Sequence, residues 1–418
     1  MKYRYLTILC MIILCIAGCG NTDGSKGIED NGNSEAIGET EGTDPVVSPE
    51  PVILAHSEEY TSDNYKPGDF SDNQNYAVLK RAAYSDKGFY ALNEDDNCVY
   101  FIDADNGKQT VLCHELSCGH SDYDCNAWYL GFQGIYYNDG YVYVMAEDMA
   151  GMQVYLYRMD PDGSNRVTVA KLYSREEEDL PCSPQFIIHR GTGYLTVNWM
   201  DTGQGIEREQ CLYRVSLADG SMDEIYKFKG YSPNICIENT EDNNIYFGVS
   251  EYKNGNIGKA SLCKEYCYNA EDEKITERST PENGVLFASY NDKMYSLDRE
   301  EEYLENGMVI LKKFKIYVTD TNGKKSKCIY KITDEEIKKQ LSVQEVNFDG
   351  KYIYIRKIFK GLYYYLCVID KNGKEIFTLD CNKTGMCRWS DGNKLLLIDN
   401  KTCRYSLYDI RTKSVIAE

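Results

Sequence analysis

Apolar and polar residues alternate with a period of two along most of the chain after about residue 80. Segments 140–145, 154–159 and 350–355 show this alternation clearly and are rich in tyrosine. Short alternating segments bounded by Asp, Asn and Gly predict β-strands whose two faces have different surroundings. Residues 335–341 are the best candidate for a short helix, and no long segment has a 3.6-residue period. The pattern therefore predicts an all-β fold.

A unit of three such strands recurs along the chain. It has a Tyr-rich strand, a variable connection, a second strand that ends in an Asp/Asn-Gly turn, and a third strand. The turn glycines are Gly107, Gly163, Gly220, Gly323 and Gly373. With one degenerate copy before Gly323, the spacing is about 50–57 residues, which suits one four-stranded sheet. Radial repetition would cover both faces of each sheet.

The sequence thus predicts a β-propeller over residues 75–418 with about seven four-stranded blades, six or eight being the alternatives. The last unit is short, so we expect a strand within residues 75–84 to complete the ring.

The segment Tyr155–Arg166, with the sequence YLYRMDPDGSNR, resembles the blade hairpin of propellers in low-density-lipoprotein-receptor-type proteins. Most of the chain after residue 80 more closely resembles a family of uncharacterised propeller lipoproteins from Gram-positive gut bacteria. This resemblance implies the fold and an extracytoplasmic location. It implies no particular activity.

The first residues have the pattern of an export signal. Lys2 and Arg4 precede an apolar run at 6–16, which is too short to cross a bilayer as a helix. Small residues at 17 and 18 followed by Cys19 resemble the lipobox of bacterial lipoproteins. That resemblance implies a signal peptide at 1–18 and a diacylated Cys19. An uncleaved anchor, or ordinary cleavage beside a chance cysteine, is the alternative.

The acidic, Gly-rich segment 19–55 contains few residues that could form a core, and it predicts a disordered linker. The whole chain has a formal charge of −20, which argues against binding to nucleic acid. We therefore expect a monomeric propeller on the extracytoplasmic face of the cell membrane, attached to the membrane through its lipid.

One dense group of potential ligands occurs between the first and second units. Cys113, Cys118, His120 and Cys125 form a Cys₃His set that suits structural zinc, with His114, Asp122 and Asp124 as spare donors. Two further interpretations stay open, a disulfide between two of these cysteines and unconnected thiols. Four protein ligands would leave no open position on the metal, so the predicted role is structural.

The sequence contains none of the common local signatures of hydrolases or nucleotide-binding enzymes. Aromatic residues that could bind a sugar or peptide are Trp128, Trp199, Tyr136–Tyr137 and Tyr363–Tyr365, although packing between blades would also explain them. The leading hypothesis is a binding or scaffold module for a protein, peptide or glycan. The alternatives are a carbohydrate-active or other hydrolytic enzyme with its site at the propeller channel, and a sensor subunit of a membrane system.

Overall fold

A computed structural model describes residues 81–93, 95–148, 150–151, 153–174, 181–199, 207–251, 262–281, 283–303, 309–320, 325–399 and 401–417. The predicted signal peptide, the lipidated Cys19, the linker 19–55 and the proposed domain start at 75 lie outside these residues. In the described part of the chain, no helix is both long and apolar enough to cross a membrane.

Seven four-stranded antiparallel sheets form the fold, and each sheet uses four strands that are consecutive in sequence. We number them blades 1 to 7. Blade 1 has β1 (Ala82–Ser85), β2 (Gly88–Asn93), β3 (Cys98–Asp103) and β4 (Gln109–Val111). Blade 2 has β5 (Leu130–Asn138), β6 (Tyr141–Glu147), β7 (Gln153–Met159) and β8 (Val167–Ser174). Blade 3 has β9 (Pro181–His189), β10 (Thr192–Trp199), β11 (Glu207–Ser216) and β12 (Met222–Tyr231).

The second half of the chain continues in the same way. Blade 4 has β13 (Asn234–Glu241), β14 (Asn244–Glu251), β15 (Leu262–Asn269) and β16 (Lys274–Arg278). Blade 5 has β17 (Val285–Tyr290), β18 (Lys293–Tyr303), β19 (Val309–Asp320) and β20 (Ser326–Lys331). Blade 6 has β21 (Leu341–Phe348), β22 (Tyr352–Phe359), β23 (Tyr363–Asp370) and β24 (Glu375–Asp380). Blade 7 has β25 (Met386–Ser390), β26 (Lys394–Ile398), β27 (Tyr405–Asp409) and β28 (Ser414–Ala417).

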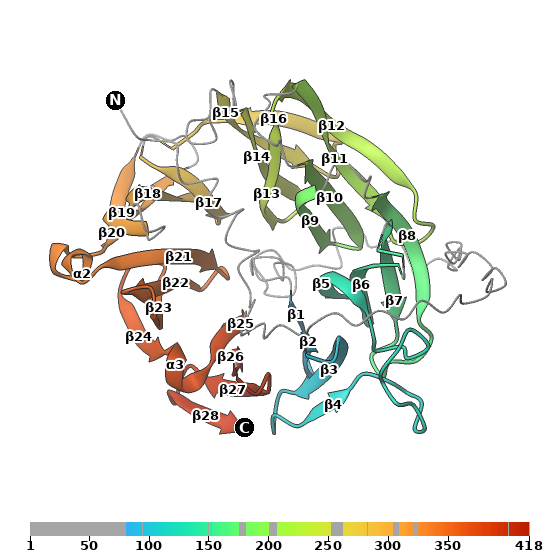
Figure 1. The fold of residues 1–418 in the computed structure, drawn as a ribbon. Coiled ribbons are helices and arrows are strands. Elements are labelled where there is room, and N and C mark those ends of the chain that lie inside the picture. The colour runs from blue at the N-terminus through green and yellow to red at the C-terminus, as the bar shows by residue number, and fades with distance from the viewer. Residues whose placement is uncertain are drawn as a thin grey trace, which may run out of the picture.

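The blades stand around a common axis, and the first and last blades are neighbours in the ring (Figure 1). The first strand of each blade lies toward the middle and the fourth strand lies at the rim (Figure 1). The predicted propeller is therefore confirmed, with seven blades. The predicted helix is also present, as α2 (Asp334–Lys338), which begins in a capping box between Thr333 and Glu336. A second short helix, α3 (Cys381–Thr384), connects blades 6 and 7.

Blade 7 meets blade 1 through side chains, not through a shared sheet. The side-chain amide of Gln109 donates to the carbonyl of Tyr405 at 2.7 Å and accepts from its N–H at 3.2 Å. The ring of Tyr405 is buried with Phe89 and Trp389 in the apolar cluster between the two blades. We expect a strand within residues 75–84 to complete the ring. Residues 75–80 lie outside the described part of the chain, and the described residues 82–84 belong to blade 1 and not to blade 7. The strand β1 opens blade 1, and blade 7 has its own inner strand, β25, which lies upstream of the short unit seen in the sequence.

The recurring turn glycines have a packing role as well as a turning role. Gly163, Gly220 and Gly373 lie between the third and fourth strands of their blades, and all have positive φ. A Cβ atom on Gly163 would overlap the backbone of Leu112, and one on Gly220 would overlap the carbonyl of Val169. Both contacts are to the rim of the preceding blade. At Gly163, Gly220 and Gly373 the repeat contains glycine because the hairpin rests directly on the backbone of the preceding blade.

Candidate functional site

The residues between blades 1 and 2 leave the rim of blade 1 and then return to it. β4 contains only three residues, and Leu112 after it still donates to the carbonyl of Val99 at 2.8 Å. The chain comes back at Ala127, whose carbonyl accepts from the N–H of Val99 at 2.8 Å, and Trp128 bridges to Cys98. Residues 113–126 are therefore an excursion whose two ends are fixed on the same strand, β3.

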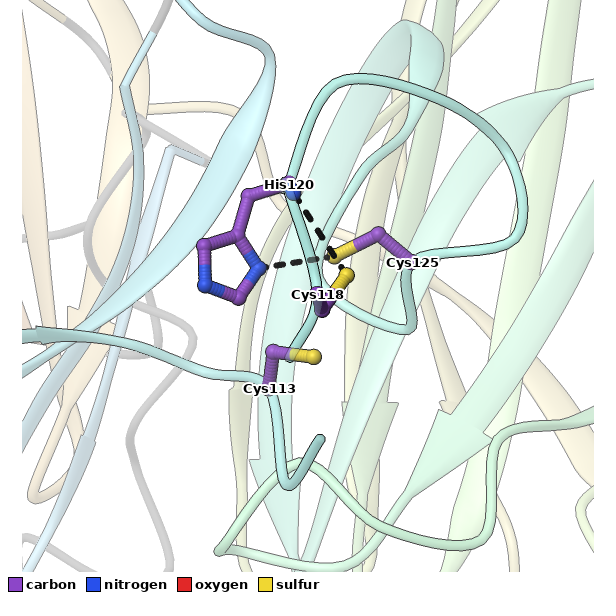
Figure 2. Close-up of side chains that lie close together, drawn as sticks. All are labelled: Cys113, Cys118, His120 and Cys125. Carbon is purple, nitrogen blue, oxygen red and sulfur yellow. Dashed lines mark hydrogen bonds between the residues drawn. The ribbon is translucent and has the colours of Figure 1, made fainter. Parts of the chain in front are cut away.

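The four predicted ligands meet in this excursion, and we call them the Cys/His cluster (Cys113, Cys118, His120 and Cys125). Their three Sγ atoms and one imidazole nitrogen all lie within 4.8 Å of one another. Figure 2 shows the side chains gathered from the beginning, middle and end of the excursion. Cys125 is buried and the other three are half-buried. The structure therefore brings together the four residues of the predicted Cys₃His set.

The backbone around His120 helps to shape the cluster. Its N–H donates to Sγ of Cys118 at 3.4 Å, and its Nδ1 lies 3.3 Å from Sγ of Cys125 (Figure 2). His120 has a φ of 52°, in the left-handed region that few residue types other than glycine adopt readily. This turn brings the imidazole back over the thiols.

Burial acts against ionisation of Cys125 and of the neighbouring Cys98 when no cation is present. Burial raises the pKa of Cys125 to about 12, and the neighbouring Cys118 and Cys113 add to the rise. The thiol of Cys98, which donates to the carbonyl of His120 at 3.3 Å, has its pKa raised to about 12 mainly by burial. A divalent cation among the sulfurs would reverse this effect because it pairs directly with the thiolates.

A single arginine from blade 2 fixes the returning end of the excursion. The guanidinium of Arg166 donates to the carbonyls of Cys125 at 2.8 Å, Trp128 at 3.2 Å and Tyr123 at 2.5 Å. It also lies 4.7 Å from the centre of the Tyr123 ring. These three hydrogen bonds fix the position of Cys125, because the accepting carbonyls belong to Cys125 itself, to a residue before it and to a residue after it.

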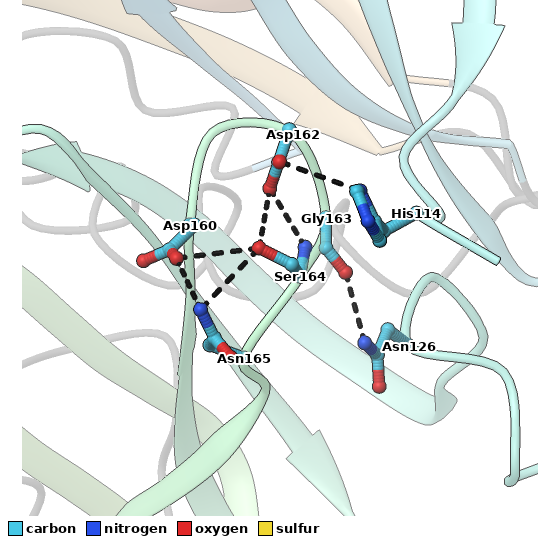
Figure 3. A network of polar contacts seen from close by, with 7 residues as sticks. All are labelled: His114, Asn126, Asp160, Asp162, Gly163, Ser164 and Asn165. Carbon is cyan, nitrogen blue, oxygen red and sulfur yellow. Dashed lines mark hydrogen bonds and ion pairs between the residues drawn. The ribbon is translucent and has the colours of Figure 1, made fainter.

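The hairpin just before Arg166 forms a second point of attachment. Its turn is held by Asp160 and Asp162, which accept hydrogen bonds from Ser164 and Asn165 (Figure 3). The side chain of Asn126 donates to the carbonyl of Gly163 at 2.9 Å. His114, one of the spare donors, lies 3.5 Å from Asp162 and so faces this hairpin. Blade 2 therefore supports the excursion along much of its length.

Replacing Arg166 with lysine should weaken Zn²⁺ binding by the Cys/His cluster by about tenfold to 100-fold, the range typical for lost supporting contacts around a metal site. One ammonium group cannot reach the three carbonyls that the planar guanidinium bridges. The measurement is a competition titration with a coloured chelator. Arg158→Lys is the control, since Arg158 lies over the ring of Tyr141 in the same blade. Equal affinities for all three proteins would contradict the positioning role of Arg166.

The structure places the other sequence candidates elsewhere. The twelve cysteines whose side chains the structure describes are free thiols, and the disulfide interpretation of the cluster stays open as a chemical alternative. Tyr136 is buried edge-on against Phe186 of the next blade, so it packs between blades. Tyr363 is half exposed. The side chain of Trp199 lies outside the described residues. Sequence reasoning missed Cys98 and Arg166, since no local spacing links either of them to the cluster.

No family model matches the sequence, and no curated protein matches it. Several solved structures are similar in shape. An oligogalacturonate lyase in complex with manganese is 12% identical, with a TM-score of 0.44 and coverage of 76% of this chain and 86% of that chain. The β-propeller domain of the Trilobed protease from Pyrococcus furiosus is 11% identical, with a TM-score of 0.45 and coverage of 80% and 93%.

TolB from Acinetobacter baumannii is 14% identical, with a TM-score of 0.35 and coverage of 79% of this chain and 76% of that chain. At these values the similarities carry no statement about what this chain binds or catalyses. The functional interpretation therefore depends on the chain's own residues.

Proposed function

We propose that this protein is a lipid-anchored, extracytoplasmic binding propeller in which the Cys/His cluster holds a structural zinc ion. The observation that carries the proposal is the meeting of three Sγ atoms and one imidazole nitrogen within 4.8 Å. Three thiolates and an imidazole are the donors that Zn²⁺ prefers, whereas Ca²⁺ and Mg²⁺ prefer oxygen ligands.

The donor set supports a structural role over a catalytic one. A tetrahedral zinc ion with four protein ligands has no position left for water or substrate. Such an ion would join the beginning, middle and end of the excursion. The end of the excursion is already fixed by hydrogen bonds to β3 and to Arg166. The metal would therefore stiffen the connection between blades 1 and 2.

A stiffened excursion supports a binding role. Leu116, between the first two cysteines of the cluster, is a fully exposed apolar residue. A loop that is already ordered loses little conformational entropy when a partner binds. The proposed partner is an extracytoplasmic protein, peptide or glycan that contacts this face of the propeller. The acidic chain does not suit nucleic acid as a partner.

The proposed location depends on Cys19 and the residues before it. In cells, the wild-type chain should sediment with membranes, and Cys19→Ala should appear in the soluble or secreted fraction because it lacks the acyl chains. Cys328→Ala, which alters an exposed thiol on β20, is the control and should remain in the membrane fraction. Membrane retention of Cys19→Ala would refute lipid anchoring. The released variant is also a convenient soluble sample for measuring zinc.

A further inference from the structure

The seven interfaces between blades are not alike. Six clusters of buried apolar side chains each lie between two adjacent blades, at the interfaces 1–2, 2–3, 3–4, 5–6, 6–7 and 7–1. Among the described residues, none of these six clusters joins blade 4 to blade 5. Apolar burial is the main stabilising contribution between sheets, so the blade 4–5 interface must be held by other contacts.

Polar side chains of blade 4 lie on the side that faces blade 5. The side chain of Asn239 donates to the carbonyl of Ser289 at 2.8 Å and accepts from its N–H at 3.1 Å. Arg278 on β16 donates to Oγ of the same serine at 2.8 Å. Glu241 accepts from the backbone N–H of Asn291 at 2.5 Å. These bonds connect blade 4 to β17 and to the turn after it.

Two glutamates meet inside this interface. Glu265 on β15 is buried, and Glu238 lies at a β-bulge between Ile237 and Asn239, where the extra residue is turned away from the regular pairing. The charge of Glu265 acts on the buried carboxyl group of Glu238. Gly248 lies between them on β14, and a Cβ atom there would be 3.1 Å from Oε1 of Glu238 and 3.4 Å from Oε2 of Glu265. The glycine therefore leaves room for the carboxyl pair.

The carboxyl pair has one nearby cation and few other partners. Oε2 of Glu238, Oε2 of Glu265 and one terminal nitrogen of Arg278 are covered from solvent and have no ordinary hydrogen-bond partner in the structure. The guanidinium of Arg278 is instead directed to Ser289 and lies 4.1 Å from the centre of the Tyr246 ring. Two neighbouring buried carboxylates repel each other, and a proton on one of them removes that repulsion.

Other ionisable groups around the pair leave the interface acidic. They are Cys236 on β13, Tyr246 on β14, Cys267 on β15 and Arg278 on β16, with Glu241 and Asp242 at the end of β13 and Asp292 on the blade 5 side. Both carboxyl groups are covered from solvent at their Oε2 atoms. The pair is therefore not interpreted as a catalytic site.

The pKa shifts in the interface all have the same direction. Burial, followed by the charge of Glu265, raises the pKa of Glu238 well above its usual range. Burial also raises the pKa of Glu265 and of Glu241. The positive charge of Arg278 offsets part of this rise in both groups. A carboxyl whose pKa is raised by folding binds its proton more tightly in the folded state. The stability that this proton contributes is complete at pH values below the pKa of the carboxyl in the unfolded chain. It is lost as the pH rises through the pKa of the carboxyl in the folded chain.

We propose that the blade 4–5 interface is a proton-dependent joint of the ring, closed when Glu238 or Glu265 carries a proton and loosened when both carboxyl groups are ionised. The inference is independent of the zinc site and of the membrane anchor, because the residues that carry it lie in blades 4 and 5. The propeller would then open locally between β13 and β17 as its surroundings become less acidic.

Amide hydrogen exchange of the full chain at pH 5 and pH 8 tests this proposal. The measured rates are first corrected for the intrinsic rate of exchange at each pH. The opening constant of the amides in β13 and β17 should then be about tenfold larger at pH 8 than at pH 5, or more. The reason is that a pKa difference of one unit corresponds to a factor of ten in the equilibrium constant. Amides in β2 and β27, at the 7–1 interface, should change much less. An equal response at both interfaces would overturn the proposal.

Two variants and a spectroscopic readout complete the test. Glu238→Gln and Glu265→Gln should each abolish most of the pH response at β13 and β17. Glu345→Gln is the matched control, because it removes a largely buried carboxyl paired with Arg356 in blade 6, and should leave the response unchanged. If neither variant folds, the wild type should still show the infrared band of a protonated carboxylic acid at neutral pH. A missing band, or a response that persists in both variants, would overturn the proposal.

Discussion

Removal of zinc from the Cys/His cluster should lower the free energy of unfolding of the purified protein by about 4 kcal/mol, if the free zinc before removal is about a thousand times the dissociation constant. The reason is that a metal bound only by the folded chain stabilises that chain in proportion to its binding free energy. Unfolding by denaturant, with and without a strong chelator, gives the difference. Added Zn²⁺ should restore the stability in full.

The cysteine variants separate metal loss from general damage to the protein. Cys118→Ser removes a ligand at the middle of the excursion, so the variant should already be destabilised and should not respond to chelator or to Zn²⁺. Cys328→Ser alters an exposed thiol on β20 and should behave like the wild type. A wild-type protein whose stability is the same with and without chelator would contradict the structural role of the metal.

Gly220→Ala should destabilise the propeller by about 2–5 kcal/mol. A residue with a Cβ at positive φ costs about 1–2 kcal/mol, and Gly220 has a φ of 71°. The new methyl would also overlap the backbone of Val169 and Ala170 in blade 2, and overpacking of this kind costs about 1–3 kcal/mol more. Backbone atoms cannot move aside as a flexible side chain can. Denaturant unfolding of the purified variant measures the loss.

Gly140→Ala is the matched control for this prediction. Gly140 has a φ of 76°, close to that of Gly220, but a Cβ there would meet nothing within 4 Å. Its cost should therefore be limited to the conformational contribution of about 1–2 kcal/mol. If the two variants were equally stable, the contact between each hairpin and the preceding blade would have no energetic role, and the repeated glycines would serve the turn alone.

The sequence predicted the outer strands of the blades better than the inner ones. The Tyr-rich strand and the Asp/Asn-Gly hairpin correspond to the second, third and fourth strands, as in β6, β7 and β8. The inner strands were missed because their alternation is interrupted. β1 is almost entirely buried, and β13 and β25 contain bulges that shift the two-residue period. The short final unit was misjudged for the same reason.

The candidate site was predictable only as far as its residues are close in sequence. Three cysteines and a histidine within residues 113–125 form a recognisable donor set, and the structure brings them together. Arg166 comes from the next blade, 41 positions after Cys125, so no local spacing could have indicated it. Glu238, Glu265 and Arg278 lie on three different strands. They become neighbours only through the register of blade 4.

The most direct test of the structural zinc site is the metal content of the purified protein, measured together with titration of its free thiols. The account predicts about one zinc per chain, with the cluster thiols shielded until a chelator releases the metal and exposes Cys113, Cys118 and Cys125. A protein without metal, in which two of these thiols are missing even after denaturation, would contradict the account and show that the excursion is closed by a disulfide.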